Sequence, residues 1–206
     1  DGVVNQLAAQ RGLESGTTPA GVLATVAALR RESELPVALY IYYNLIHRHG
    51  QKRFIRDAAE AGVDGLLILD LPPEESGESA QQMRAAGLCS IRLVAPTTPD
   101  DRVPAIVKQA SGFVYCVSRE GVTGMQARVA GTIGDMTTRI RRHTDLPIAV
   151  GFGISNVEQA RAVARDADAV VVGSAVVDRI ARGAGRSDLV ESVAAFVRSL
   201  AEAVHP

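Results

Sequence analysis

Two glycine turns near the C-terminus constrain the fold of this chain most. The sequence GFGIS at 151–155 follows the apolar run 147–150, and Gly173-Ser174 follows the β-branched run 169–172. The segment between the turns is long enough for one helix and one connection, so they end consecutive βα units. Each glycine could simply relieve the backbone of a tight βα turn. Two such turns in successive units favour a phosphate site instead, because backbone N–H groups and a helix N-terminus can then converge on the anion.

Strand-like and helix-like patterns alternate along the whole chain, which predicts a parallel α/β sheet. Thr18 and Pro19 are typical of an N-cap and a first helical position. Further helices are expected at 49–61, 74–86, 99–110, 132–144, 157–165 and 187–204. Strands are expected at 36–43, 63–69, 90–95, 112–117, 147–150 and 167–172.

These six strands fall short of a closed barrel whose phosphate site lies in its last two units. The predicted fold is therefore a single-domain (β/α)8 TIM barrel, residues 1–206, that carries strands 3 to 8 and lacks the first two βα units. The chain begins Asp1-Gly2 rather than with Met, and we expect an N-terminal segment to be absent.

Composition excludes several classes of function. The net charge of −1, with basic and acidic residues intermixed, argues against nucleic acid as a partner. Apolar runs are too short to span a membrane, and the two cysteines, Cys89 and Cys116, suggest no disulfide framework, so a cytoplasmic protein is expected. His47 and His49 lack a Cys, Asp or Glu at ligand spacing, so we interpret them as solvated loop residues and predict no metal site.

Four more motifs, in chain order, accompany the glycine turns. They are Asp1-Gly2 before a polar helix, YYNL at 42–45, DLPPEE at 70–75 and SREGVTG at 118–124. Together with GFGIS at 151–155 they closely resemble the α subunit family of tryptophan synthase, and the resemblance runs through the whole chain.

The resemblance implies a carbon–carbon lyase of tryptophan biosynthesis with a TIM-barrel fold. Family members cleave indole-3-glycerol phosphate to indole and glyceraldehyde 3-phosphate. They work in an α2β2 complex with a β subunit, to which indole passes. Pyridoxal phosphate is expected only in that β subunit, so this chain is expected to carry no cofactor.

The resemblance also assigns roles to particular residues. Asp1 matches the catalytic aspartate that stabilises positive charge on the indole, and Tyr115 matches an active-site tyrosine. The substrate- and phosphate-binding residues implied are Leu67, Tyr40, Arg119, Thr123, Gly124, Gly153, Gly173 and Ser174. Of these, Arg119, Thr123 and Gly124 belong to a lid that closes over the substrate, and Tyr40 stands where the family more often has an aliphatic residue. Asp70, Pro72 and Pro73 match the surface that communicates with the β subunit.

One family residue is missing from the chain. The glutamate that shuttles protons at indole C3 and at the glycerol hydroxyl would precede Asp1. Glu74 and Glu75 are typical of a helix start, and Glu120 lies in the lid, so none of the three replaces it by spacing. The chain as given is therefore expected to be inactive.

Two other functions stay open on the sequence. One is a different phosphate-binding barrel enzyme of amino-acid or cofactor biosynthesis, although the SREGVTG lid argues against it. The other is a non-catalytic partner that only activates a β subunit, which the missing glutamate keeps possible.

Overall fold

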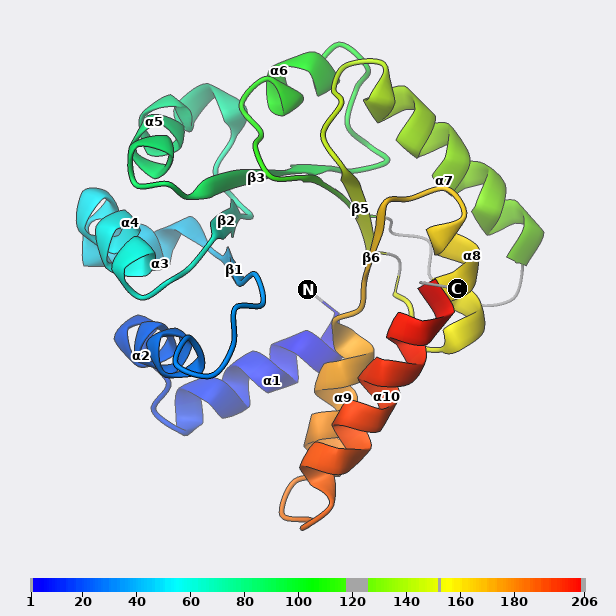
Figure 1. The fold of residues 1–206 in the computed structure, drawn as a ribbon. Helices are drawn as coiled ribbons and strands as arrows, with labels where there is room; N and C mark the ends of the chain where they lie inside the picture. The colour runs from blue at the N-terminus through cyan, green and yellow to red at the C-terminus, as the bar shows by residue number, and fades with distance from the viewer. Residues whose placement is uncertain (1, 118–125, 152, 205–206) are drawn as a thin grey trace.

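The computed structural model describes residues 2–117, 126–151 and 153–204, and its centre is a curved parallel sheet (Figure 1). The sheet has six strands in the order of the sequence, β1 to β6, and every neighbouring pair is parallel. The strands are β1 (Ala38–Ile41), β2 (Gly65–Ile68), β3 (Cys89–Val94), β4 (Val114–Val117), β5 (Ile148–Gly151) and β6 (Ala169–Val171). Sequential parallel pairing with helical crossovers makes this a half-barrel.

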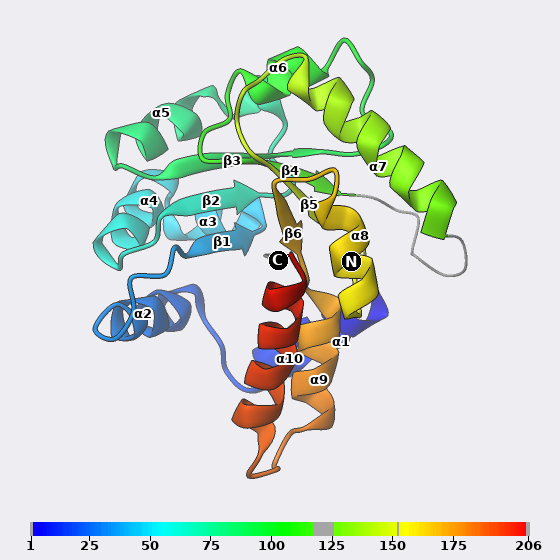
Figure 2. The ribbon, with the colours of Figure 1, turned by 45° about the vertical axis from the view of Figure 1, so that its right-hand side comes forward.

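Helices surround the sheet on its convex side, and the remaining helices lie below its open side (Figures 1 and 2). They are α1 (Val3–Glu14), α2 (Pro19–Leu29), α3 (Tyr43–His49), α4 (Gln51–Glu60), η1 (Pro73–Glu75), α5 (Gly77–Ala85), α6 (Val103–Val107), α7 (Gln126–Arg141), α8 (Val157–Ala164), α9 (Ser174–Arg182) and α10 (Leu189–Val204). Helix α9 contacts α1 on one side and α10 on the other. Within the described ranges, no helix is both long and apolar enough to cross a membrane.

All six strands and most helices agree with the sequence-based expectation, and the exceptions have local causes. Thr18 caps α2 as predicted, its hydroxyl accepting a hydrogen bond from Gly21 N. The helix expected at 49–61 was wrong at its start, because Gly50 has φ +90° and separates α3 from α4. The helix expected at 99–110 is shorter in the structure, where α6 covers Val103–Val107. No helix was predicted for the residues of α9.

Burial differs sharply between the middle and the edges of the sheet. All four residues of β2 and of β5 are buried, as expected for parallel strands covered on both faces. Residues of β1 and β6, which border the sheet, are exposed or half-buried. The outward-facing side chains pack against the helices in two apolar clusters, one centred on Phe54 and Leu66 and the other on Val114 and Ile148.

The packing of the cluster around Val114 and Ile148 predicts how much stability a core substitution costs. Ile148 is fully buried in β5, so Ile148→Ala should lower the free energy of unfolding by about 2–5 kcal/mol through lost burial and the cavity left behind. Val190→Ala is the matched control, because Val190 is 80% exposed and its truncation should change stability by less than about 0.5 kcal/mol. Urea unfolding measures both, and equal losses for the two variants would contradict this packing.

Candidate active site

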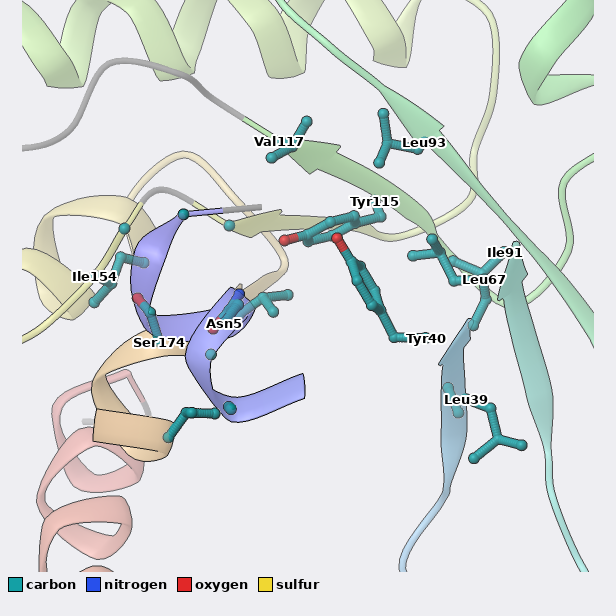
Figure 3. Close-up of a pocket in the computed structure, with 18 of the residues that line it drawn as sticks. Asn5, Leu39, Tyr40, Leu67, Ile91, Leu93, Tyr115, Val117, Ile154 and Ser174 are labelled. Atoms are coloured by element: carbon teal, nitrogen blue, oxygen red, sulfur yellow. The ribbon is translucent and has the colours of Figure 1, made fainter. Parts of the chain in front are cut away.

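The concave face of the sheet encloses one large cavity of about 970 Å³. Side chains that point inward from successive strands form its wall, and α1 approaches it from the open side (Figure 3). In β3 the alternation of a strand places Ile91 and Leu93 on the cavity side, while Arg92 between them faces the helices. The cavity therefore lies where the fold brings the carboxyl ends of the strands together.

Six of the residues singled out from the sequence meet in this cavity although they are far apart in the chain. They are Tyr40 of β1, Leu67 of β2, Tyr115 of β4, Gly153 after β5, and Gly173 and Ser174 after β6. Asp1, Arg119, Thr123 and Gly124 lie outside the described residues, and so does most of the predicted lid.

One side of the cavity is an aromatic and aliphatic wall. The rings of Tyr40 and Tyr115 meet edge to face, with centroids 6.4 Å apart and planes at 87° (Figure 3). Leu67 contributes an aliphatic face beside them. Such a surface suits a flat aromatic ligand, because edge-to-face and stacked contacts add to the burial of apolar area.

Burial raises the pKa of both tyrosine hydroxyls, which are protonated at neutral pH. It raises the pKa of Tyr115 to about 12, with smaller contributions from Tyr40 and Cys116, and it also raises the pKa of Tyr40. The Tyr115 hydroxyl is therefore a hydrogen-bond donor in the cavity rather than a base.

Gly151 is required by the position of Tyr115. A Cβ on Gly151 would lie 2.2 Å from the Tyr115 hydroxyl oxygen and 2.9 Å from two ring carbons. In the parallel register Val117 is opposite Gly151, so the Tyr115 ring reaches forward over the neighbouring strand. The first glycine of the GFGIS turn thus makes room for an aromatic side chain.

The other end of the cavity is built from backbone. Gly153 has φ +63°, a conformation that favours glycine, and Ser174 is the first residue of α9, with Gly173 as its N-cap. The first N–H groups of a helix have no acceptor within that helix, and its N-terminus favours an anion. Gly173 has φ −110°, and a Cβ there would meet open space, so neither conformation nor packing among the described residues demands glycine. Close approach of a ligand would demand it.

Acidic side chains are absent from this cavity as far as the described residues form its lining. Glu74 instead accepts two hydrogen bonds from the Arg102 guanidinium, at 2.8 and 3.0 Å, and Glu75 lies in η1. Neither glutamate lines the cavity.

Asp70, Pro72 and Pro73 lie together on the connection after β2, outside the large cavity. The Asp70 Oδ1 accepts a hydrogen bond of 2.7 Å from the backbone N–H of Tyr43, the first residue of α3. This carboxylate therefore caps a helix that follows the neighbouring strand.

The interpretation of His47 and His49 as loop residues was wrong, although His47 is exposed to solvent as expected. Both belong to α3, and the His49 side chain is only 20% exposed. Its Nε2 lies 2.8 Å from Asp57 Oδ2, and its ring meets Phe54 edge to face. The pairing lowers the pKa of Asp57, with a further contribution from Arg56. The described residues contain no group of three His, Cys, Asp or Glu side chains that could hold a metal ion.

Sequence reasoning missed the contribution of α1. Gly2, Asn5 and Ala8 line the cavity, and the Asn5 Oδ1 is buried without a hydrogen-bond partner among the described residues. Figure 3 shows Asn5 beside the glycine-lined end, near Ser174. Ile91, Leu93 and Val117 could have been found from strand alternation alone.

Parallel βα units in sequence order, with glycine turns and a helix start after the last two strands, are typical of phosphate-binding α/β barrel enzymes. The family model of the tryptophan synthase alpha chain matches residues 1–205. A tryptophan synthase alpha chain from Opitutus terrae is 54% identical over 197 residues, which are 96% of this chain and 74% of that relative. The chain belongs to the tryptophan synthase alpha chain family, a lyase family of tryptophan biosynthesis, and the resemblance inferred from the motifs is confirmed.

Solved structures agree with this assignment. The tryptophan synthase alpha chain from Legionella pneumophila has a TM-score of 0.89 at 33% identity, with 100% of this chain and 76% of that chain covered. A chain of the tryptophan synthase complex from Pyrococcus furiosus has a TM-score of 0.86 at 35% identity, with 98% of this chain and 81% of that chain covered.

The contact between Gly151 and Tyr115 predicts a measurable coupling. Gly151→Ala should destabilise the fold by about 1–3 kcal/mol, because the new Cβ collides with the ring. In the Tyr115→Leu background the same substitution should cost at least 0.5 kcal/mol less, an interaction energy of roughly the size found for contacting residues. A double-mutant cycle from urea unfolding measures this coupling.

Gly77→Ala is the control for that cycle, since a Cβ on Gly77 meets nothing within 4 Å. It should leave stability within about 0.5 kcal/mol of the parent. Additive losses for Gly151→Ala and Tyr115→Leu would show that the ring does not occupy the space over Gly151.

Tyr115 also predicts a loss of stability at alkaline pH. Its pKa is raised to about 12 in the folded chain, from an ordinary value of 10.0, so the neutral hydroxyl is favoured by folding. This stabilisation is complete below pH 10 and is lost as the pH rises through 10 toward 12. Tyr115→Phe should weaken the decline in unfolding free energy over that range, and urea unfolding at a series of pH values measures it. An unchanged decline in Tyr115→Phe would contradict the burial of this hydroxyl.

Proposed function

We propose that this chain binds indole-3-glycerol phosphate and contributes to its aldol cleavage into indole and glyceraldehyde 3-phosphate. The observation that supports this most is the two-part character of one cavity. The cavity of about 970 Å³ has an aromatic wall at Tyr40 and Tyr115 and, at its other end, a glycine-lined helix start at Gly173. A ligand that joins a flat apolar ring to a phosphate fits both ends at once.

The residues of this chain divide the work as follows. Tyr40 and Leu67 pack against the indole ring, and backbone N–H groups of Gly153, Gly173 and Ser174 hold the phosphate. Tyr115 donates a hydrogen bond from its protonated hydroxyl. Thr123, Arg119 and Gly124 belong to the lid that excludes water, with Gly124 also reaching the phosphate.

Cleavage needs a proton added at indole C3 and another removed from the glycerol hydroxyl next to the ring. The electron pair of the broken carbon–carbon bond returns to the ring, and the hydroxyl carbon becomes the aldehyde. Asp1 would stabilise the positive charge on the protonated ring. We assign the two proton transfers to the family's glutamate, whose place in the family precedes that of Asp1.

We also propose that β1 to β6 correspond to strands 3 to 8 of an eight-stranded barrel. The exposed edges at β1 and β6 support this, as does the match to 74% of the length of the Opitutus terrae relative. On this view turnover needs two further βα units besides the six strands described here.

The partner proposed is a tryptophan synthase β subunit, and pyridoxal phosphate is expected only there. One related structure is of the tryptophan synthase complex from Pyrococcus furiosus, and another concerns mutual activation in the a2b2 complex of that organism. Asp70, Pro72 and Pro73 form the proposed contact surface. A role limited to activating the β subunit is the second candidate, because the described cavity lining holds no acid.

Substrate binding tests the proposal directly. Ser174→Asp places a carboxylate where the phosphate would lie, and should weaken binding of indole-3-glycerol phosphate at least about tenfold, which corresponds to roughly 1.4 kcal/mol. Ser187→Asp adds the same charge on an exposed connection and should leave affinity unchanged. Isothermal titration calorimetry measures both.

Turnover assays with and without a β subunit then separate the two candidates. Binding without cleavage, together with faster β-subunit turnover, supports the activating role. Cleavage after the first two βα units are supplied supports the lyase role. Equal affinity of Ser174→Asp and the parent chain would contradict the phosphate site itself.

A further inference from the structure

A second, smaller cleft has a volume of about 280 Å³, and among the described residues it shares one lining residue, Leu93, with the large cavity. It lies between the connection after β2 and helix α6. Its rim is mostly apolar, from Ile68, Leu71, Pro72, Pro73 and Ile106, and its polar residues are Asp70, Arg92 and Arg102. The roles proposed for the substrate cavity do not use this cleft, whereas Asp70, Pro72 and Pro73 of its rim also belong to the proposed contact surface for a β subunit.

Arg92 is the unusual residue of this cleft. It occupies an outward-facing position in the middle of β3 and is only 5% exposed. Its Nε is buried without a hydrogen-bond partner in the part of the chain that the structure describes. The hydrogen bond recorded for its guanidinium is a long one, 3.5 Å from Nη2 to the Gln109 Oε1.

No carboxylate of the described residues neutralises this buried charge. Asp70 accepts the backbone N–H of Tyr43, and Glu74 is engaged by Arg102. Gln109 is neutral and shares its Oε1 with the Ser76 hydroxyl, while its Nε2 donates to the Pro73 carbonyl. Burial accordingly lowers the pKa of Arg92, yet a guanidinium stays charged at any physiological pH.

A buried, unpaired charge is costly, and the cost falls when an anion occupies the site. We propose that the cleft binds a small aliphatic carboxylate, whose oxygens pair with the Arg92 guanidinium and whose alkyl chain packs against Pro72, Pro73 and Ile106. This inference does not depend on the proposed lyase function.

The chemistry of the rim favours a monovalent carboxylate over a phosphate. A planar carboxylate matches the fork of a guanidinium, and Arg92 is the one cation of the described cleft left without an acidic partner. Asp70 and Glu74 nearby would repel a dianion more strongly. The apolar rim gives nothing to a bare inorganic ion but would gain buried area from a short alkyl chain.

Butyrate and its neutral isostere butyramide test the proposal on the intact chain. A ligand that binds the folded state raises Tm in a saturable way. At about ten times the dissociation constant, butyrate should raise Tm by about 3 °C or more at fixed pH and ionic strength. Butyramide and sodium chloride should not.

Arg92→Met keeps the length of the side chain and removes the charge. This variant should lose the butyrate response and, without butyrate, should melt no lower than the parent chain, since a buried unpaired charge has been replaced by an apolar group. Arg186→Met is the matched control: Arg186 is exposed and pairs with Asp188, and the variant should keep the full butyrate response.

Two outcomes would overturn the proposal. One is an equal Tm response to butyrate and butyramide in the parent chain, a result that needs no variant and holds even if Arg92→Met fails to fold. The other is a butyrate response in Arg92→Met as large as that of the parent, which would place the carboxylate elsewhere.

Discussion

The pairing of β4 with β5 is the constraint on which the rest of this structure depends. Four residue pairs are in parallel register, from Val114 opposite Ile148 to Val117 opposite Gly151. They lie between the helix-side core and the wall of the large cavity. Outward-facing residues of this pair fill the helix-side core, and the inward-facing Tyr115 forms the cavity wall. The register also fixes where the GFGIS turn begins. Stability and site geometry are therefore set by the same few backbone hydrogen bonds.

Much of this architecture could be predicted because parallel strands have a strong sequence signal. Near-continuous apolar runs located all six strands, and the glycines after β5 and β6 indicated one end of the cavity, where the structure brings them together. Tyr40, Leu67 and Tyr115 came from the family resemblance, and strand alternation explains why they face one space. Their side-chain geometry, such as the edge-to-face contact, depends on neighbours that no local pattern specifies.

The sequence-based predictions failed for residues whose environment depends on a partner elsewhere in the chain. His49 read as a loop residue because its acceptor, Asp57, lies on the next helix beyond Gly50. The burial of Arg92 was not predicted, because one charged residue in the strand CSIRLV suggests an exposed face. In the structure α6 contacts this strand. Burial is a property of the assembled layers, so an isolated charge in a strand cannot be interpreted from its own sequence window.

The hydrogen bond from Tyr43 N to Asp70 has a mechanical consequence. It ties the connection after β2 to the first residue of α3, which lies only three positions along the chain from Tyr40 in the cavity wall. A shift of the segment at Asp70 must either break this bond or drag the start of α3 with it. The connection after β2 and the aromatic wall of the cavity are thus linked through one hydrogen bond, which the Asp70 carboxylate accepts.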